Sequence, residues 1–339
     1  MHRQMKILIF STVFYPAIGG IENLTLLLIR EFIKKGHSVK VITQQKQSTP
    51  LEGFEVFYSP GILKSLELFR WCDVYYMPNI SLKGIWLLFS NSSKRWVISH
   101  NDFSSFNKKG LLPAIKNFAI KYASQNIAVS NSVARCIKNE PRVIYNCFDN
   151  SVFRVYEEEQ RVFDFVFLGR LVSQKGCDLL IKACADLKRP FTLNIIGDGP
   201  EKPYLQQLVE ESGLQKQILF YGFLKDADLA KMLNRHRTMV IPSMGEEGFG
   251  IVALEGLACG CRIVAADAAG LSEAVGIYGK HFPMGNKESL INILAEELIY
   301  AETQFLQPNG QLVTLHDLNE HLKNHHKSVV ADRYLSYFG

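Results

Sequence analysis

Two cationic residues near the middle of the chain have the spacing of a diphosphate-binding pair. Arg170 and Lys175 lie in the segment 169–176, directly after an apolar run that is typical of a buried strand. An arginine can hold a phosphate with two parallel hydrogen bonds, and a lysine adds a concentrated charge. The segment begins and ends with glycine, which lets a ligand approach the backbone. The pattern predicts a cationic clamp for a diphosphate; the alternative is two solvated surface cations.

Two carboxylates further along the chain could recognise the sugars of the same ligand. Glu247 and Glu255 are eight positions apart, and the glycines between them keep Glu247 in a loop while Glu255 falls within the following helix. A loop carboxylate can bind sugar hydroxyls, and a helical one can accept hydrogen bonds from a ribose. The first amides of that helix would face the phosphates. These amides belong to Phe249, Gly250 and Ile251.

The first half of the chain offers two further candidates at the ends of expected strands. Gly19 and Gly20 open a helix after the first apolar run, where free amide groups and the helix dipole favour an anion. His100 follows the apolar run 96–99. A histidine in this position can orient a ligand, although a lone histidine is more often structural.

These residues require a scaffold that brings the ends of several strands together. Apolar, β-branched runs alternate with amphipathic helical patterns along both halves, which is typical of βα repeats with parallel sheets. The pattern pauses near residue 150. We therefore expect an α/β protein of two Rossmann-like, doubly wound domains, residues 1–150 and 151–312, with a helical tail at 313–339. A ligand cleft is expected between the carboxyl ends of the two sheets.

Composition narrows the class of protein. The 339 residues are 47% hydrophobic and 21% charged, which excludes a disordered or collagen-like chain, and no apolar run is long enough to cross a bilayer. The seven cysteines form no CxxC pair and indicate reduced thiols. We expect a cytoplasmic protein.

The charge is distributed unevenly. Residues 1–150 carry 19 Lys and Arg against 9 Asp and Glu, whereas residues 151–339 carry 19 against 24. The basic half could face an anionic membrane or a phosphate-bearing acceptor, or the excess could be surface drift. In residues 104–121 lysines alternate with large apolar residues. This stretch is the candidate for peripheral contact with the inner face of the cytoplasmic membrane.

Six motifs together resemble one family. Their order and spacing are similar to those of the retaining glycosyltransferases of family four, which have the GT-B fold, from about residue 5 to 305. The second half matches more closely. The motifs are Gly19-Gly20-x-Glu22, Gly169-Arg170-x4-Lys175-Gly176, Gly197-Asp198-Gly199-Pro200-Glu201, Tyr221-Gly222-Phe223, Pro242-Ser243-x3-Glu247-Gly248-Phe249-Gly250 and Glu255-x2-Ala258-x-Gly260.

The resemblance implies a role for each matched residue. Arg170 and Lys175 would neutralise the donor diphosphate, Glu255 would hold the ribose, and Glu247 would contact the donor sugar together with the nearby amides. From the first domain, Gly20 would lie against phosphate and sugar, and His100 would lie near the transferred sugar. The segment 221–223, with Gly222 and Phe223, would border the nucleobase. The implied donor is a UDP- or GDP-linked sugar, and the implied acceptor is a glycan or a lipid-linked hydroxyl.

The chain also departs from the family pattern in three places. The family's Gly-Gly-x-x-Glu loop is represented by residues 269–273, in which Ala269 replaces the first glycine. The expected domain link, residues 145–149, lacks its usual glycine. The tail at 314–339 is only loosely similar to the family's crossing C-terminal helix, which packs back on the first domain.

The sequence predicts a hexosyltransferase that needs no metal. Asp226-Ala227-Asp228 spells a metal-binding motif of another glycosyltransferase fold, but it begins a helical pattern where aspartate is favoured for capping. No nucleic acid partner is expected. A nicotinamide dehydrogenase is disfavoured because no Gly-x-Gly-x-x-Gly follows the first strand. A non-catalytic sugar-nucleotide-binding subunit of a partner enzyme remains the alternative.

Overall fold

The computed structural model divides the chain into two compact units. It describes residues 3–339 except for the stretches 16–18, 46–50, 104–105, 107–109 and 300–313. The first unit comprises residues 1–147 and 326–339, and the second comprises residues 148–325. The division therefore falls inside the link segment 145–149, and the chain crosses between the units twice.

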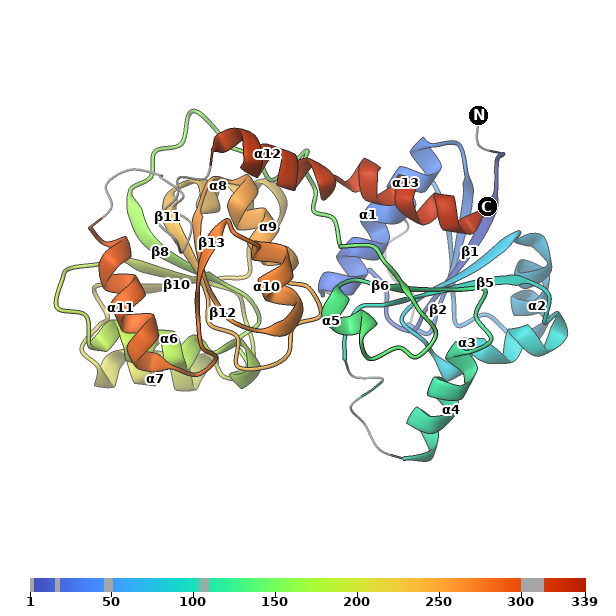
Figure 1. The fold of residues 1–339 in the computed structure, drawn as a ribbon, viewed down its shortest axis with the longest axis horizontal. Helices are drawn as coiled ribbons and strands as arrows, with labels where there is room; N and C mark the ends of the chain where they lie inside the picture. The colour runs from blue at the N-terminus through green and yellow to red at the C-terminus, as the bar shows by residue number, and fades with distance from the viewer. Residues whose placement is uncertain (1–2, 16–18, 46–50, 104–105, 107–109, 300–313) are drawn as a thin grey trace. The chain divides into compact units, whose positions relative to one another are not determined.

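The first unit is built on a seven-stranded parallel sheet (Figure 1). Its strand order is β3-β2-β1-β4-β5-β6-β7, so the order reverses between β1 and β4. The central strands are buried on both faces, which explains their uninterrupted apolar runs. The strands are β1 (Lys6–Ser11), β2 (Ser38–Thr43), β3 (Glu55–Tyr58), β4 (Val74–Pro78), β5 (Arg95–His100), β6 (Gln125–Ala128) and β7 (Arg142–Val143).

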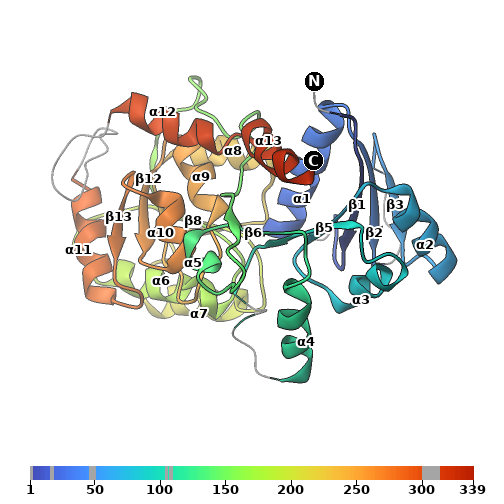
Figure 2. The ribbon, with the colours of Figure 1, turned by 45° about the vertical axis from the view of Figure 1, so that its right-hand side comes forward.

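The helices of this unit include one from the far end of the chain. They are α1 (Gly20–Lys34), α2 (Ile62–Trp71), α3 (Leu82–Ile85), the 3-10 helix η1 (Trp86–Ser90), α4 (Leu111–Ile120), α5 (Asn131–Ala134) and α13 (Lys327–Phe338). α13 lies beside α1 (Figures 1 and 2). The ring of Phe338 is 5.4 Å from that of Phe32 and 5.4 Å from that of Tyr76. Lys35 and Asp332 form an ion pair at 2.8 Å.

The expected C-terminal tail is thus divided between the two units. α12 (Leu315–Asn324) belongs to the second unit, and only residues from His326 onward belong to the first. The described tail is helical on both sides of this division.

The second unit repeats the doubly wound plan with six parallel strands. Its order is β10-β9-β8-β11-β12-β13, with the reversal between β8 and β11. The strands are β8 (Phe163–Leu168), β9 (Leu193–Ile196), β10 (Ile218–Gly222), β11 (His236–Ile241), β12 (Arg262–Ala266) and β13 (Gly279–Phe282). The helices are η2 (Ser173–Lys175), α6 (Cys177–Ala185), α7 (Lys202–Glu211), α8 (Asp226–Asn234), α9 (Ile251–Ala258), α10 (Ala269–Val275), α11 (Lys287–Glu297) and α12.

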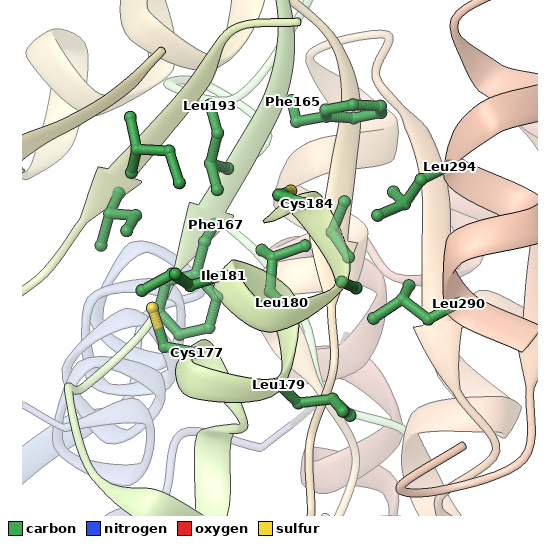
Figure 3. Close-up of a cluster of buried hydrophobic side chains, with 14 of the residues drawn as sticks. Phe165, Phe167, Cys177, Leu179, Leu180, Ile181, Cys184, Leu193, Leu290 and Leu294 are labelled. Atoms are coloured by element: carbon green, nitrogen blue, oxygen red, sulfur yellow. The ribbon is translucent and has the colours of Figure 1, made fainter. Parts of the chain in front are cut away.

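A buried cluster fixes the sheet of the second unit against α6 and α11. Figure 3 shows Leu180 and Ile181 of α6 facing Phe167 and Leu193 of the strands, with Leu290 from α11 beside them. The two cysteines of this cluster, Cys177 and Cys184, are also buried, and burial raises the pKa of both thiols. They act as apolar core residues. Because β8 and α6 are held rigidly, the loop between them has a fixed start and end.

Candidate functional site

In the second unit, the predicted cation and carboxylate meet where the strand order reverses. Lys175 follows β8 and Glu247 follows β11, and Lys175 Nζ lies 2.5 Å from Glu247 Oε1. The hydroxyl of Ser243 donates to the same carboxylate oxygen at 2.7 Å. The amide of Met244 also donates to the carbonyl of Gln174 at 2.8 Å. Ligands of open α/β sheets bind at this reversal point, beyond the carboxyl ends of the strands.

Gly176 allows these two loops to come so close. Its φ of +67° is a left-handed conformation, and a Cβ there would lie 2.0 Å from the carbonyl oxygen of Pro242. Any other side chain would push the β8 loop away from the β11 loop. The glycine after Lys175 is therefore required for the contact between Lys175 and Glu247.

Arg170 lies in the same loop with its side chain exposed. Within the described residues, its guanidinium makes no ion pair or hydrogen bond, in contrast to the amine of Lys175. The preceding Gly169 donates its amide to Ile196 and so continues the β8 pairing. An exposed guanidinium beside a paired lysine can bind an incoming anion without first breaking an ion pair.

The start of α9 supplies the predicted helix N-terminus. Gly250 caps it with a φ of +94°, and the helix begins at Ile251. The side chain of Phe249 is buried, with its ring 5.5 Å from that of His325, which directly follows α12. Phe249 can therefore offer a ligand its backbone but not its ring.

Glu255 lies one turn into α9 in an environment that disfavours its charge. Burial, and next the negative charge of Asp149, raise the pKa of Glu255 to about 8. No described cation forms an ion pair with it. At neutral pH the carboxyl group is mostly protonated, and a ligand that needs the carboxylate must displace that proton.

The loop after β12 completes this edge. The amide of Gly270 donates to the carbonyl of Glu247 at 3.0 Å, and a Cβ on Gly270 would lie 2.1 Å from the carbonyl oxygen of Gly248. Ala269 replaces the family's first glycine here and adopts a positive φ of 31°. The loop thus keeps a left-handed residue at a position where the side chain makes this conformation costly.

The end of β10, together with the residue that follows it, presents aromatic side chains to solvent. Tyr221 and Phe223 are exposed, and Gly222 between them has a φ of +71°. The amide of Gly197 donates to the carbonyl of Gly222 at 2.7 Å, which ties this segment to the loop after β9. Exposed aromatic rings at the carboxyl end of a strand are suited to stacking on a nucleobase.

In the first unit, the predicted glycine turn begins α1. Gly19 precedes the helix in an extended conformation, and Gly20 is its first residue. The carboxylate of Glu22 folds back over Gly19, where a Cβ would lie 2.1 Å from Glu22 Oε2. A phosphate could bind this helix end only if Glu22 moved aside.

His100 ends β5 and is almost fully buried. Its Nε2 lies 3.0 Å from the side-chain oxygen of Asn126, and its ring is 5.5 Å from that of Phe106. Burial lowers the pKa of His100 to about 4. It is therefore neutral at physiological pH and can act through hydrogen bonds but not as a cation.

The residues after His100 form a polar network at the same sheet edge. Asn79, which has a φ of +83°, donates from its side chain to Asp102 at 3.0 Å and accepts from the amide of Asn101 at 2.8 Å. The side-chain oxygen of Asn101 is buried and has no hydrogen-bond partner. An unpaired buried acceptor is costly, so this oxygen is available to accept a hydrogen bond.

The structure places Asp226 and Asp228 in the first turn of α8. In the described part of the chain, no group of three His, Cys, Asp or Glu side chains is arranged to hold a metal ion. The same part contains no helix with the length and apolar content to cross a bilayer.

Comparisons with known proteins agree with this architecture. A glycosyltransferase from Rickettsia africae superposes with a TM-score of 0.83 at 17% identity, covering 99% of this chain and 98% of that chain. Anabaena HepE, crystallised with UDP and glucose, superposes with a TM-score of 0.79 at 22% identity, covering 98% and 99%. The fold is that of the GT-B glycosyltransferases, as predicted.

The sequence comparison is strongest in the second unit. Residues 150–300 match the family model of the group 1 glycosyl transferases. An uncharacterized glycosyltransferase of Methanocaldococcus jannaschii is 32% identical over 194 residues, which cover 53% of each protein. The chain therefore spans about half the length of this curated relative. The predicted resemblance is confirmed.

Two polar residues that hydrogen-bond to predicted site residues were not identified from the sequence. Ser243 bonds Glu247, and Asn126 bonds His100. Ser243 stands within a quoted motif, four residues before Glu247, and could have been identified there. Asn126 is 26 positions from His100, and only the pairing of β5 with β6 brings them together.

Proposed function

We propose that this protein is a retaining glycosyltransferase that moves a sugar from a UDP- or GDP-linked donor to an acceptor hydroxyl. The contact of Lys175 with Glu247 and Ser243 at the strand reversal carries the proposal, because it joins a cation for the diphosphate to a carboxylate for the sugar. The GT-B fold and the bound UDP and glucose in the HepE structure support the same class of donor.

In the proposed reaction, the departing diphosphate is the group whose charge must be stabilised. Arg170, Lys175 and the amides at the start of α9 supply positive charge and hydrogen-bond donors in one loop cluster. The leaving phosphate accepts the proton of the attacking hydroxyl on the same face of the sugar. His100, being neutral, orients a hydroxyl and does not act as an acid.

The proposal needs no metal ion, because protein cations occupy the position of a metal beside the diphosphate. Transfer is therefore expected to persist in the presence of EDTA, measured as product formed per minute with and without chelator. A complete loss of transfer that manganese or magnesium restores would contradict this expectation. It would direct attention back to Asp226 and Asp228.

The product itself decides between catalysis and binding alone. The full chain should be incubated with UDP- and GDP-sugars and with glycan and lipid-linked acceptors, and the products analysed by mass spectrometry. A glycosylated acceptor is expected in the mass spectra, and the proton NMR coupling constants of the same product should show a retained anomeric configuration. Nucleotide-sugar binding without transfer, in the same mixtures, would instead favour the non-catalytic subunit of a partner enzyme.

We further propose that the acceptor belongs to bacterial cell-surface polysaccharide or glycolipid synthesis, and that α4 docks on the cytoplasmic membrane. Leu111, Leu112, Ile115, Phe118 and Tyr122 are 42% to 77% exposed, so helix burial does not account for them. Figure 2 shows α4 standing apart from the sheet of its unit. Lys116 and Lys121 adjoin this apolar face, and residues 1–150 carry excess positive charge. Apolar residues flanked by lysine suit an anionic lipid surface.

Sedimentation with vesicles tests this docking. The wild type should pellet with phosphatidylglycerol-containing vesicles at low salt but not with neutral ones, and salt should weaken the binding. The variant Leu112→Ser/Phe118→Ser/Lys116→Glu should remain in solution. Tyr204→Ser removes an exposed ring from α7 of the second unit and should pellet normally. Equal pelleting of the wild type and the triple variant would contradict the proposal. Lys108 and Lys109, part of the predicted contact, lie outside the described residues.

A further inference from the structure

Each unit contains a buried asparagine that hydrogen-bonds to a buried histidine, and the two pairs differ in which residue donates. In the second unit, His236 Nδ1 lies 2.7 Å from the carbonyl of Met232, and Nε2 lies 2.9 Å from Asn194 Nδ2. A carbonyl only accepts, so Nδ1 carries the hydrogen and Nε2 accepts from the asparagine amide. Both ring nitrogens of His236 therefore have partners within the fold, as expected of a structural residue.

His100 is held in the opposite sense by Asn126. The amide nitrogen of Asn126 donates to the carbonyl of Ile120 at 3.1 Å, which turns its oxygen toward His100 Nε2. This oxygen only accepts, so Nε2 must carry the hydrogen and Nδ1 must be a lone-pair acceptor. No described group hydrogen-bonds to Nδ1.

The surroundings of His100 suit a ligand hydroxyl better than a phosphate. The charged group that acts on the ring is Asp102, which opposes an anion, and the next residue, Asn101, adds a second unpaired acceptor. A bare nitrogen lone pair repels phosphate oxygens but accepts a hydrogen bond from a sugar hydroxyl.

We propose that Asn126 is a positioning residue that fixes His100 as the neutral Nε2-protonated tautomer, so that Nδ1 accepts a hydrogen bond from a sugar hydroxyl. The inference rests on the proposed glycosyltransferase function and specifies the chemistry of its first-unit edge. Asn126 itself is a buried residue of β6 that donates to the carbonyl of Ile120, and it acts on the ligand only through His100.

Two substitutions of Asn126 separate positioning from general stability. In Asn126→Asp, the donor to the Ile120 carbonyl is lost, so the melting temperature should fall as it does in the control below, but the carboxylate still accepts from Nε2 and also stabilises the imidazolium, so the pKa of His100 rises. Transfer should be near wild type at alkaline pH, and the acid limb of kcat/KM should move up by about one pH unit or more. In Asn126→Leu the tautomer is no longer fixed, and kcat/KM should fall about 10-fold across the pH range.

Asn194→Asp is the matched control in the second unit. There the asparagine amide is the donor, so aspartate cannot replace it, and the melting temperature should fall while the acid limb stays in place. An acid limb that is the same in Asn126→Asp and in the wild type would overturn the positioning role of Asn126.

A spectroscopic measurement tests the tautomer without activity. Two-bond 15N–1H spectra of 15N-histidine-labelled protein distinguish the two neutral tautomers, and His100→Gln identifies the His100 signals. We expect the Nε2-protonated form in the wild type and a mixture in Asn126→Leu. An Nδ1-protonated His100 in the wild type would overturn the inference. The expected tautomer in a protein that transfers no sugar would instead overturn the proposed function and with it the hydroxyl ligand.

Discussion

Replacing Lys175 or Arg170 by alanine is expected to lower kcat/KM at least about 100-fold while leaving the fold intact. Each cation stabilises charge that develops on the leaving diphosphate, so its loss is felt most strongly in the transition state. Lys175 is only partly buried and Arg170 is exposed, so neither truncation leaves a cavity in the core. Initial rates over a range of donor concentrations, with thermal melting as a check on folding, measure the effect.

Lys182→Ala is the matched control for this prediction. Lys182 is also ion-paired, with Asp178 at 2.8 Å, and lies in α6, the helix that directly follows the site loop. Its removal should change kcat/KM by less than about twofold, because a surface pair of this kind contributes little. Near-wild-type turnover in Lys175→Ala or Arg170→Ala would remove that residue from the diphosphate site.

Because Lys175 contacts Glu247, a comparison of the single variants with the double variant tests whether the two residues act together. Glu247 shares one oxygen with the amine of Lys175 and the hydroxyl of Ser243. Losing Lys175 therefore also frees Glu247, and the effects of Lys175→Ala and Glu247→Ala should be less than additive in the double variant. Fully additive losses would mean that the two residues act independently once the donor is bound.

Alanine substitutions of the two carboxylates, Glu247 and Glu255, are expected to change different kinetic parameters. Glu247→Ala should lower kcat more than it weakens donor binding, whereas Glu255→Ala should weaken donor binding more than it lowers kcat. A ribose contact is present equally in the ground state and the transition state, but a contact to the reacting sugar changes between them. Steady-state kinetics give the split between kcat and KM. If both variants only raised KM, the assignment of Glu247 would be wrong.

The raised pKa of Glu255 gives its assignment an independent test by pH. Ribose hydroxyls donate to the carboxylate, so binding must release the proton that Glu255 holds below its pKa of about 8. The affinity for UDP or GDP should therefore rise about fourfold from pH 7.5 to 9 and then level off. The terminal phosphate, with a second pKa of roughly 6, is already ionised in this range.

Glu255→Gln is the control for this pH dependence, since it cannot ionise. Its nucleotide affinity, measured by calorimetry, should be weaker and flat over the same range. The same variant should be relatively more stable than the wild type at high pH. The wild-type fold loses stability as pH rises from about 4.5, the pKa of Glu255 in the unfolded chain, to about 8, because the unfolded chain ionises Glu255 more readily than the folded protein does. Glutamine carries no ionisable group, so Glu255→Gln lacks this loss. An equal slope in both proteins would remove Glu255 from the ribose site.

The periodicity and motif spacing predicted much of the second unit. The apolar strands that Gly169 and Pro242 follow must place their loops at one sheet edge, because parallel strands joined by helices share their direction. That rule brings Lys175 and Glu247 to the same edge without any knowledge of side-chain contacts. The quoted motifs also contain the glycines at 176 and 250, and the structure adds the reason, since both adopt left-handed conformations that other residues avoid.

Other features depend on packing between segments that are far apart in the sequence. The division of the tail between α12 and α13 is decided by Phe338, which packs on Phe32 and Tyr76, and by the partners of α12 in the second unit. The exposure of the apolar face of α4 is likewise decided by the tertiary structure, because an amphipathic pattern does not say whether another element covers it.

The sequence by itself determined the βα plan, the strand ends and the residue types that could bind a nucleotide sugar, because each depends on local spacing. Only the tertiary structure decided their chemical states. Burial beside Asp149 makes Glu255 a weak acid, and burial makes His100 neutral while Asn126 accepts from its Nε2. A protonation state depends on solvent exclusion and on neighbours from distant strands, and a linear pattern does not contain either of these.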